Sequence, residues 1–314
     1  MKKILTLLLA LWMLTGCVAM AAGNQLVVGS TTAMSGAFFT DLFGSNTADI
    51  DVRALLHGYN LMSWDHETGT YQINDSVVAG MAVSRDAQNN RVYTFDLYGD
   101  LKFSDGSAIT AKDYAFSILL TASPELAKLG GQSAAVGAIL GMDAYQSGKS
   151  SVLRGVRLLS DTQMSITISK AYEPYFYEMA LFDYSPYPIS VLAPGCKVVD
   201  TEKGVGIVNA SGTGAAIFTA ALLQKTILDA ATGYMSRPSV VSGPYTLTRY
   251  DAQSATASFA INPYYKGNED GEKPTIETIV YRTVANDEAI DLLLSGEVDL
   301  LNKMVAADTI SKGI

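Results

Sequence analysis

The chain is poor in the residues that metal, redox and nucleophilic chemistry depend on. Its 314 residues include two Cys and two His. His57 and His66 are too far apart to form a metal-binding pair on successive helix turns, and neither stands in a recognisable catalytic-triad context. Gly204-Val205-Gly206 lacks the later spaced glycine of a nucleotide-binding loop. A glycosidase needs only two carboxylates, so it is the enzyme class that the composition leaves open.

Basic residues are also scarce. There are 22 Lys and Arg against 31 Asp and Glu, which gives a formal charge of −9. Nucleic-acid binding depends on clustered Lys and Arg, so we expect no nucleic-acid partner. Acidity alone says little about a cationic ligand, because it also keeps an exported protein soluble.

Long apolar runs are missing except at the N-terminus. Residues 4–14 are almost wholly apolar and follow the basic pair Lys2 and Lys3. A bilayer-spanning helix needs about 20 residues, so this run is too short to span but fits the core of a signal peptide. The sequence therefore predicts an exported protein.

The residues after this run predict a lipid anchor. Leu14-Thr15-Gly16-Cys17 is similar to a bacterial lipobox, in which the cysteine sulfur carries a diacylglycerol. We expect a signal peptide over residues 1–16, lipidation of Cys17 and a tether over residues 17–24, with the acyl chains holding the protein on a membrane. The alternative is an ordinary secretory signal cleaved after Ala21 or Ala22.

With Cys17 lipidated, Cys196 has no partner in the sequence. An unpaired cysteine in an exported protein calls for an explanation. Either it is a buried thiol that packs as a small hydrophobic side chain, or its partner lies outside this sequence.

The segment 93–117 is the most informative local pattern. Residues 93–97 alternate apolar and polar side chains, which predicts a half-buried strand. Asp105-Gly106 is a turn pair, because glycine accepts a positive φ. Thr110 stands at a helix N-cap, and Asp113 three residues later suits a capping box.

Periodicity predicts several further elements. The helix expected over residues 49–56 has Ile50, Ala54 and Leu55 on one side. Residues 204–214 are rich in small residues and are expected to form a flexible connector or loop, followed by an amphipathic helix over residues 215–231. Strands are expected at 25–29, 155–158, 164–168, 245–250 and 257–262.

Four separated motifs resemble one protein family. They are the strand, turn and capped helix of residues 93–117, Ser242-Gly243-Pro244-Tyr245, Asn262-Pro263-Tyr264-Tyr265, and the helix-to-strand passage over residues 293–300. In this order they are similar to the family 5 extracellular solute-binding proteins, the peptide and nickel receptors of ABC importers. The resemblance covers residues 25–314.

The resemblance implies an α/β fold of the type II periplasmic-binding-protein kind. It implies a lobe with an inserted α/β domain, and a second lobe that is largely missing because family members are considerably longer. The expected boundaries are 25–48 and 190–278 for lobe I, 49–189 for the inserted domain, and 279–314 for the start of lobe II.

The expected ligand contacts lie in the loop after the first strand. In α/β sheets ligands bind outside the carboxyl ends of strands, and the resemblance places this loop on the cleft. The five candidate residues are Thr32, Ala33, Met34, Ser35 and Gly36. Tyr245, Tyr59 and Trp64 are interpreted as core aromatics, and Asp65-His66-Glu67 as a solvated loop. No catalytic residue, metal ligand or cofactor is assigned.

The function that the resemblance implies is capture of oligopeptides for delivery to an ABC permease. The protein would be a monomeric receptor, anchored through lipid to the outer face of the cytoplasmic membrane or facing the periplasm, and would make or break no bond. The same receptor class also serves nickel chelates and oligosaccharides, which stay open as alternatives. A secreted hydrolase is the remote alternative.

Overall fold

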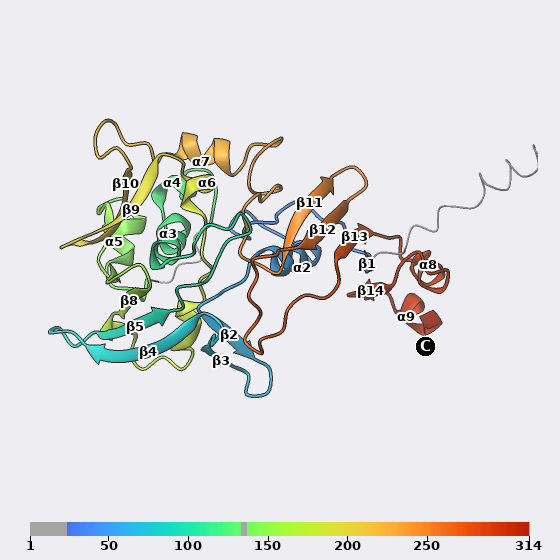
Figure 1. Ribbon diagram of the computed structural model, residues 1–314, viewed down its shortest axis with the longest axis horizontal. Coiled ribbons are helices and arrows are strands. Elements are labelled where there is room, and N and C mark those ends of the chain that lie inside the picture. Colours follow the sequence, from blue (N-terminus) through green and yellow to red (C-terminus); the bar gives the residue numbers. More distant parts are fainter. Residues whose placement is uncertain (1–23, 133–136, 314) are drawn as a thin grey trace, which may run out of the picture.

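The computed structural model describes residues 24–132 and 137–313. A five-stranded sheet occupies one part of the molecule, and a mixed α/β region with three smaller sheets occupies the other (Figure 1). The expected signal peptide over residues 1–16 and the expected lipidation site Cys17 lie outside the described residues. Within the described ranges no helix is both long and apolar enough to cross a membrane.

The larger sheet has the strand order β11-β12-β13-β1-β14. Strand β1 lies between β13 and β14 and pairs in parallel with both, so the carboxyl ends of these three strands meet at one edge. β11 and β12 form the predicted antiparallel hairpin. The strands are β1 (Gln25–Ser30), β11 (Tyr245–Asp251), β12 (Thr256–Ile261), β13 (Thr278–Thr283) and β14 (Leu300–Asn302).

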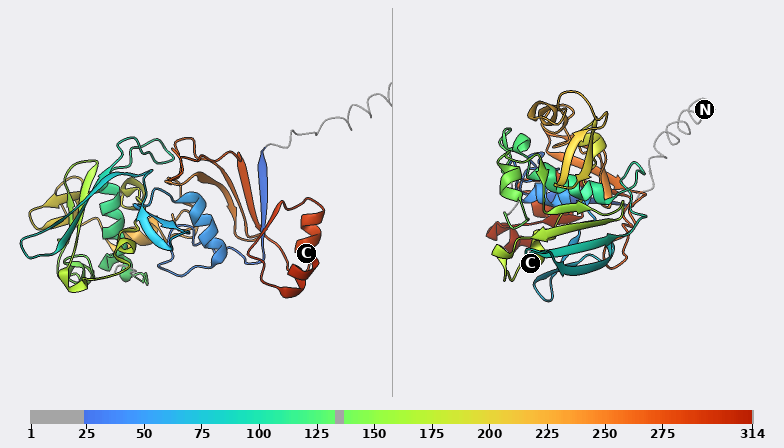
Figure 2. Two further views of the ribbon diagram at one scale, coloured as in Figure 1. Left: turned by 90° about the horizontal axis from the view of Figure 1, so that it is seen from below. Right: turned by 90° about the vertical axis from the view of Figure 1, so that its left-hand side faces the viewer.

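Helices cover both faces of this sheet. α2 (Thr47–Leu56) lies on one face, and α8 (Ala289–Leu294) and α9 (Ala307–Gly313) lie beyond the other (Figure 2). The predicted helix over 49–56 is confirmed, but its predicted face is wrong. Ile50 is 49% exposed, whereas Val52 is fully buried. Hydrogen bonds to a polar side chain explain this difference. Ser35 donates to the Asp49 carboxylate inside the protein, so the side of α2 that carries Asp49 faces the core.

The strand and capped helix predicted over residues 93–117 are confirmed. β5 buries Tyr93, Phe95 and Leu97 and lies in an antiparallel sheet of order β4-β5-β8-β7. The Asp113 carboxylate accepts hydrogen bonds from the N–H and the hydroxyl of Thr110 at 2.8 and 2.9 Å, at the start of α3. The elements are β4 (Val78–Arg85), β5 (Arg91–Leu97), β7 (Val156–Leu158), β8 (Gln163–Ile168) and α3 (Ala111–Thr121).

A third sheet corrects the expected connector over residues 204–214. Its first six residues form strand β10 (Gly204–Asn209), which lies between β6 (Val152–Leu153) and β9 (Cys196–Thr201). A Cβ on Gly204 would overlap the carbonyl oxygen of Leu153. The glycines that looked like flexibility in the sequence therefore allow close packing of β6 on β10.

The remaining elements are short. The helix expected over 215–231 is confirmed only as α7, because residues 210–219 form an irregular loop. The elements are β2 (Met62–Asp65), β3 (Thr70–Ile73), α4 (Pro124–Ala127), α5 (Met142–Gln146), α6 (Ile189–Leu192), α7 (Ala220–Thr226) and the 3₁₀ segments Lys170–Tyr172 and Glu178–Phe182.

Apolar clusters and strand pairing join segments across several of the expected boundaries. α2 packs its buried side chains with those of β1, β11, β12 and β13, although residues 49–56 were assigned to the inserted domain. β9, β10 and α7 share one apolar cluster with β5 and α3, although they were assigned to lobe I. β13 and β14 flank β1, so both strands of the segment expected to open lobe II lie in the same sheet as β1.

The strand at residues 204–209 predicts an uneven response to two glycine substitutions. Gly204 and Gly212 both have positive φ, but a Cβ on Gly212 would meet nothing within 4 Å. We expect Gly204→Ala to lower the free energy of unfolding by about 2 kcal/mol more than Gly212→Ala, because only Gly204→Ala adds overlap to backbone strain. Urea unfolding followed by circular dichroism measures this difference. Equal losses would restore the flexible-connector interpretation.

Candidate functional site

The predicted ligand loop follows β1, and hydrogen bonds to Asp49 and Asn46 at the start of α2 hold it in place. The Ser35 N–H and hydroxyl donate to the Asp49 carboxylate at 2.8 and 2.6 Å, and the Gly36 N–H donates to it at 3.2 Å. The Asn46 side chain donates to the Ala33 carbonyl at 2.8 Å. The backbone N–H groups of Ser35 and Gly36 are therefore already used inside the protein, and they are not available to a ligand.

Exposure varies along the loop. Ala33 and Ser35 are exposed, Thr32 is half-buried, and Met34 and Gly36 are buried. Thr32 forms a tight turn with Ser30. The Ser30 hydroxyl donates to the Thr32 carbonyl at 3.2 Å and accepts from the Thr32 N–H at 3.2 Å. Because the N–H and hydroxyl of Ser35 are bound to Asp49, we keep Thr32 and Ala33 as the candidates for ligand contact.

A second polar group lies at the same edge of the sheet, and no sequence motif indicates it. The Asp51 carboxylate on α2 accepts hydrogen bonds from the Tyr281 hydroxyl at 3.0 Å and the Asn302 amide at 2.7 Å. Lys303 forms an ion pair with Asp51 at 2.5 Å. Tyr281 lies within β13, Asn302 is the last residue of β14 and Lys303 follows it, so Asp51 ties both strands to α2.

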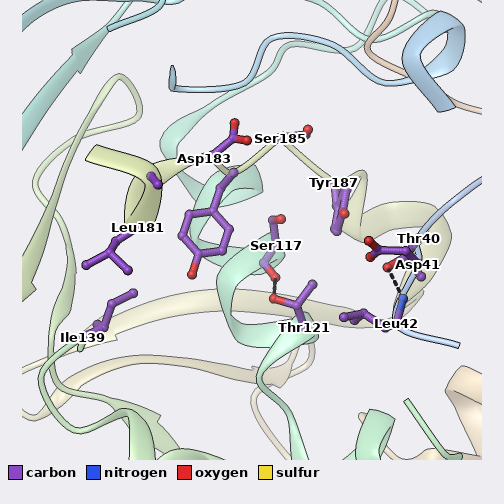
Figure 3. A pocket seen from close by; sticks show the side chains of 12 residues that line it. Thr40, Asp41, Leu42, Ser117, Thr121, Ile139, Leu181, Asp183, Ser185 and Tyr187 are labelled. Atoms are coloured by element: carbon purple, nitrogen blue, oxygen red, sulfur yellow. Dashed lines mark hydrogen bonds between the residues drawn. The ribbon is translucent and has the colours of Figure 1, made fainter. Parts of the chain in front are cut away.

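A cleft opens between residues 39–42, which follow the predicted ligand loop, and residues 180–187. Two cavities of about 380 and 420 Å³ make up this cleft. Figure 3 shows the first of them, with side chains contributed by several chain segments around a central space. The cleft residues common to both cavities are Thr40, Asp41, Asp183, Ser185 and Tyr187.

Hydrogen bonds to Asn60 fix one wall of the cleft. The Asn60 amide donates to Asp183 at 2.7 Å, and the Ser185 hydroxyl donates to the Asn60 side-chain oxygen at 2.6 Å. The Leu61 N–H donates to the Tyr184 carbonyl at 3.1 Å. This bonding presents the Asp183 carboxylate and Tyr187 to the cavity from a defined backbone (Figure 3).

The aromatic hydroxyls of the cleft are neutral at pH 7, and burial moves their pKa still further from that pH. Burial raises the pKa of Tyr187 to about 12, and the negative charge of Asp41 adds to the rise. Burial likewise raises the pKa of Tyr184 to about 12, with Asp183 as the second cause. At neutral pH both hydroxyls can therefore donate and accept hydrogen bonds, as an uncharged polar ligand requires.

The charged groups of the cleft are two carboxylates and one guanidinium. Desolvation in the cleft raises the pKa of Asp183, and the hydrogen bond from Asn60 partly opposes this. Arg53 donates to the Ala37 carbonyl at 2.8 Å and the Ser45 hydroxyl at 3.2 Å. The guanidinium is thus engaged by neutral oxygens, and it supports the backbone beside the cleft.

His57 is a structural residue of this wall. Its Nε2 lies 3.0 Å from the Phe38 carbonyl, and burial lowers the pKa of the ring to about 4. A neutral imidazole that donates to a backbone carbonyl is not poised to take up a proton at neutral pH.

The other singled-out residues divide between core and surface. Tyr245 and Tyr59 are buried as predicted, and the Tyr59 hydroxyl accepts from the Lys266 N–H at 2.6 Å. Trp64 was predicted to be a core aromatic, but it is 43% exposed. Asp65 accepts from the Thr68 hydroxyl in a surface turn. Within the described ranges no group of three or more His, Cys, Asp or Glu is arranged to hold a metal ion.

Solved structures with this arrangement define the fold as that of a periplasmic binding protein. Lactococcal OppA, complexed with an endogenous peptide in the closed conformation, matches with a TM-score of 0.67 and 19% identity over 93% of this chain and 48% of that chain. OppA from Burkholderia pseudomallei matches with a TM-score of 0.60 and 18% identity over 93% of this chain and 49% of that chain. The predicted α/β fold class is confirmed.

The family is established by the sequence. The model of the bacterial extracellular solute-binding proteins, family 5, matches residues 76–312, so the chain belongs to this family. The family expected from the motifs is thus confirmed.

Two curated relatives are named as oligopeptide-binding proteins. The oligopeptide-binding protein OppA of Lactococcus lactis subsp. lactis (strain IL1403) is 27% identical over 233 residues, which is 73% of this chain and 32% of that protein. The periplasmic oligopeptide-binding protein OppA of Escherichia coli (strain K12) is 33% identical over 111 residues, 35% of this chain and 20% of that protein. The chain spans about a third or less of the length of these relatives.

The hydrogen bond from Asn60 to Asp183 predicts that removing the Asn60 side chain will change the pKa of Asp183. We expect Asn60→Ala to raise the pKa of Asp183 further above its usual range, because desolvation remains while the bond that favours the carboxylate is lost. Carboxyl carbon shifts in an NMR titration measure it. The surface carboxylate Asp86 is the control, since its pKa is lowered mainly by Asn90 and should not move. A lowered Asp183 pKa would contradict this account.

Proposed function

We propose that this protein is an oligopeptide receptor of an ABC importer. One agreement carries the proposal. The chain belongs to family 5, and a curated relative that aligns with 73% of it is an oligopeptide-binding protein. The cleft adds support, because its neutral tyrosine hydroxyls and two carboxylates suit a ligand with many N–H donors.

A peptide backbone needs such partners. Each buried N–H or C=O that finds no hydrogen bond costs about 1–3 kcal/mol, so a peptide site must offer polar groups along its length. We assign Asp183 and Tyr187 to this role in the cleft. Thr32 and Ala33, at the carboxyl end of β1, are assigned to backbone contacts with the ligand, with Met34, Ser35 and Gly36 shaping the loop that presents them.

Membrane attachment is the second part of the proposal. Cys17 in the segment Leu14-Thr15-Gly16-Cys17 would carry the lipid, which would hold a monomeric receptor at the outer face of the cytoplasmic membrane or on the periplasmic side. Ligand exchange with the permease subunits would then occur at the membrane surface. No cofactor and no bond-making step is part of this proposal.

Blocking the cleft should weaken peptide binding. Asp41 lines both cavities and is exposed, so Asp41→Trp fills the cleft without entering the core. We expect at least tenfold weaker binding of tri- to pentapeptide pools, seen as a loss of the ligand-induced rise in Tm. Asp287→Trp, the same change at an exposed site outside the cleft, should behave as the unmodified protein.

Three outcomes would each overturn a different part of the proposal. Equal peptide binding by Asp41→Trp would move the site away from the cleft while leaving the peptide receptor intact. A response to nickel–histidine chelates or oligosaccharides, with none to peptides, would replace the oligopeptide by one of these ligands. Hydrolysis of added peptide or glycoside by the pure protein would favour a hydrolase instead.

The lipid anchor has its own test. In cells fed an alkyne-bearing fatty acid, the protein should be labelled and sediment with membranes, and Cys17→Ser should abolish both, because the acceptor sulfur is gone. Cys196→Ser is the matched control and should keep the label. A mature N-terminus directly after Ala21 or Ala22, found by mass spectrometry, would show an ordinary secretory signal.

A further inference from the structure

A separate cavity lies in the mixed α/β region, away from the cleft. It has a volume of about 660 Å³ and shares no lining residue with the two cleft cavities. Volumes of this size are typical of ligand-binding sites. Its lining includes three runs of consecutive residues, which are 150–152, 206–209 and 212–214.

Consecutive lining residues show that this cavity follows a strand edge. Side chains of a strand point alternately to opposite faces, so a cavity on one face meets every second residue. Here four successive residues of β10, from Gly206 to Asn209, line the cavity. The cavity is therefore a slot along the side of β10, and it continues the line of β6 where that strand ends.

The hydrogen-bond pattern shows which backbone groups face the slot. The Ala210 N–H donates to the Gly195 carbonyl at 2.7 Å, on the side of β9. Because backbone groups alternate along a strand, those of Ile207 and Asn209 point the other way, toward the slot. Among the described residues, β6 pairs with β10 only as far as Gly206.

One donor and one acceptor are thereby offered to a ligand. The Asn209 carbonyl already accepts from the Gly212 N–H at 3.0 Å. The Ile207 carbonyl and the Asn209 N–H are left facing the slot. A C=O and an N–H separated by one residue on a strand edge are the groups with which a single residue of an added parallel strand pairs.

The opposite wall of the slot is held in shape. The Asn209 side-chain amide donates to the Thr213 and Ala215 carbonyls at 2.9 and 2.8 Å, and its oxygen accepts from the Ile217 N–H at 2.9 Å. One side chain thus folds the loop after β10 back over the slot. A loop arranged in advance loses less entropy when a ligand binds.

The charge of the slot selects against ionic ligands. Glu125 is the one carboxylate in the lining, and it is already paired with Lys128 at 2.5 Å and with the Ala220 N–H at 2.8 Å. The other lining side chains are apolar or carry neutral hydroxyl or amide groups. A ligand with a free charge would find no opposite charge available here.

We propose that this slot binds an uncharged, extended peptide segment by strand addition to β10. The ligand backbone pairs with the Ile207 carbonyl and the Asn209 N–H, and its small or β-branched side chains lie between Val199 and Phe218 on the slot walls. The site is independent of the cleft and of the ligand carried there.

The test uses the full chain and the capped peptide acetyl-Ala-Val-Ser-Val-Ala-amide. We expect its binding to shift the backbone NMR signals of Ile207, Asn209 and residues 212–214. Ala216 is exposed and lines the slot, so Ala216→Trp should weaken binding at least tenfold in calorimetry. Ala215→Trp is the matched control, since Ala215 is exposed but does not line the slot, and it should bind as before.

A second ligand tests the backbone pairing itself. The same peptide methylated on its three central amide nitrogens keeps its side chains but cannot donate from those residues, so it should bind at least tenfold more weakly. Equal binding of both peptides, equal binding by Ala216→Trp, shifts confined to cleft residues, or no binding at all would each overturn the proposal. Asp41→Trp should leave this binding unchanged, which separates failure here from failure of the cleft.

Discussion

The buried carboxylate of Asp49 is the interaction on which the ligand-side structure depends. It is fully buried and accepts hydrogen bonds from Ser35, Gly36 and the N–H of Asn46. A buried carboxylate is stable only when such donors surround it, so the loop after β1 and the start of α2 must fold as one unit. Because Asp49 faces inward, the rotation of α2 about its axis is set as well.

That rotation decides what α2 presents to the cleft. With Asp49 turned inward, Arg53 and His57 reach the backbone beside the cleft, where they hold the carbonyls of Ala37 and Phe38. The facing wall is held through Asn60, so both sides of the cleft are fixed by side-chain bonds to backbone or to neighbouring carboxylates. The slot beside β10 follows the same principle, since a single amide side chain folds its wall.

Local patterns in the sequence predicted local structure well. The alternation over residues 93–97 and the hairpin of β11 and β12 were predicted correctly, because their signals lie within a few residues. The cleft was missed because Asp41 and Asp183 come together only through the fold, with no spacing signal to link them. Residues 204–214 were misjudged for another reason: glycine at Gly206 indicates flexibility in a loop but close approach in a sheet, where its Cβ would lie 2.9 Å from the Ser151 carbonyl.

Cys196 gives the mixed α/β region an internal reporter of its own integrity. It is the one cysteine among the described residues, it is buried on β9 next to β10, and burial raises the pKa of its thiol. Thiolate rather than thiol reacts with alkylating reagents, so both access and chemistry protect it in the folded state. The rate at which Cys196 is alkylated therefore measures how often this sheet opens locally at β9, with no label introduced into the protein.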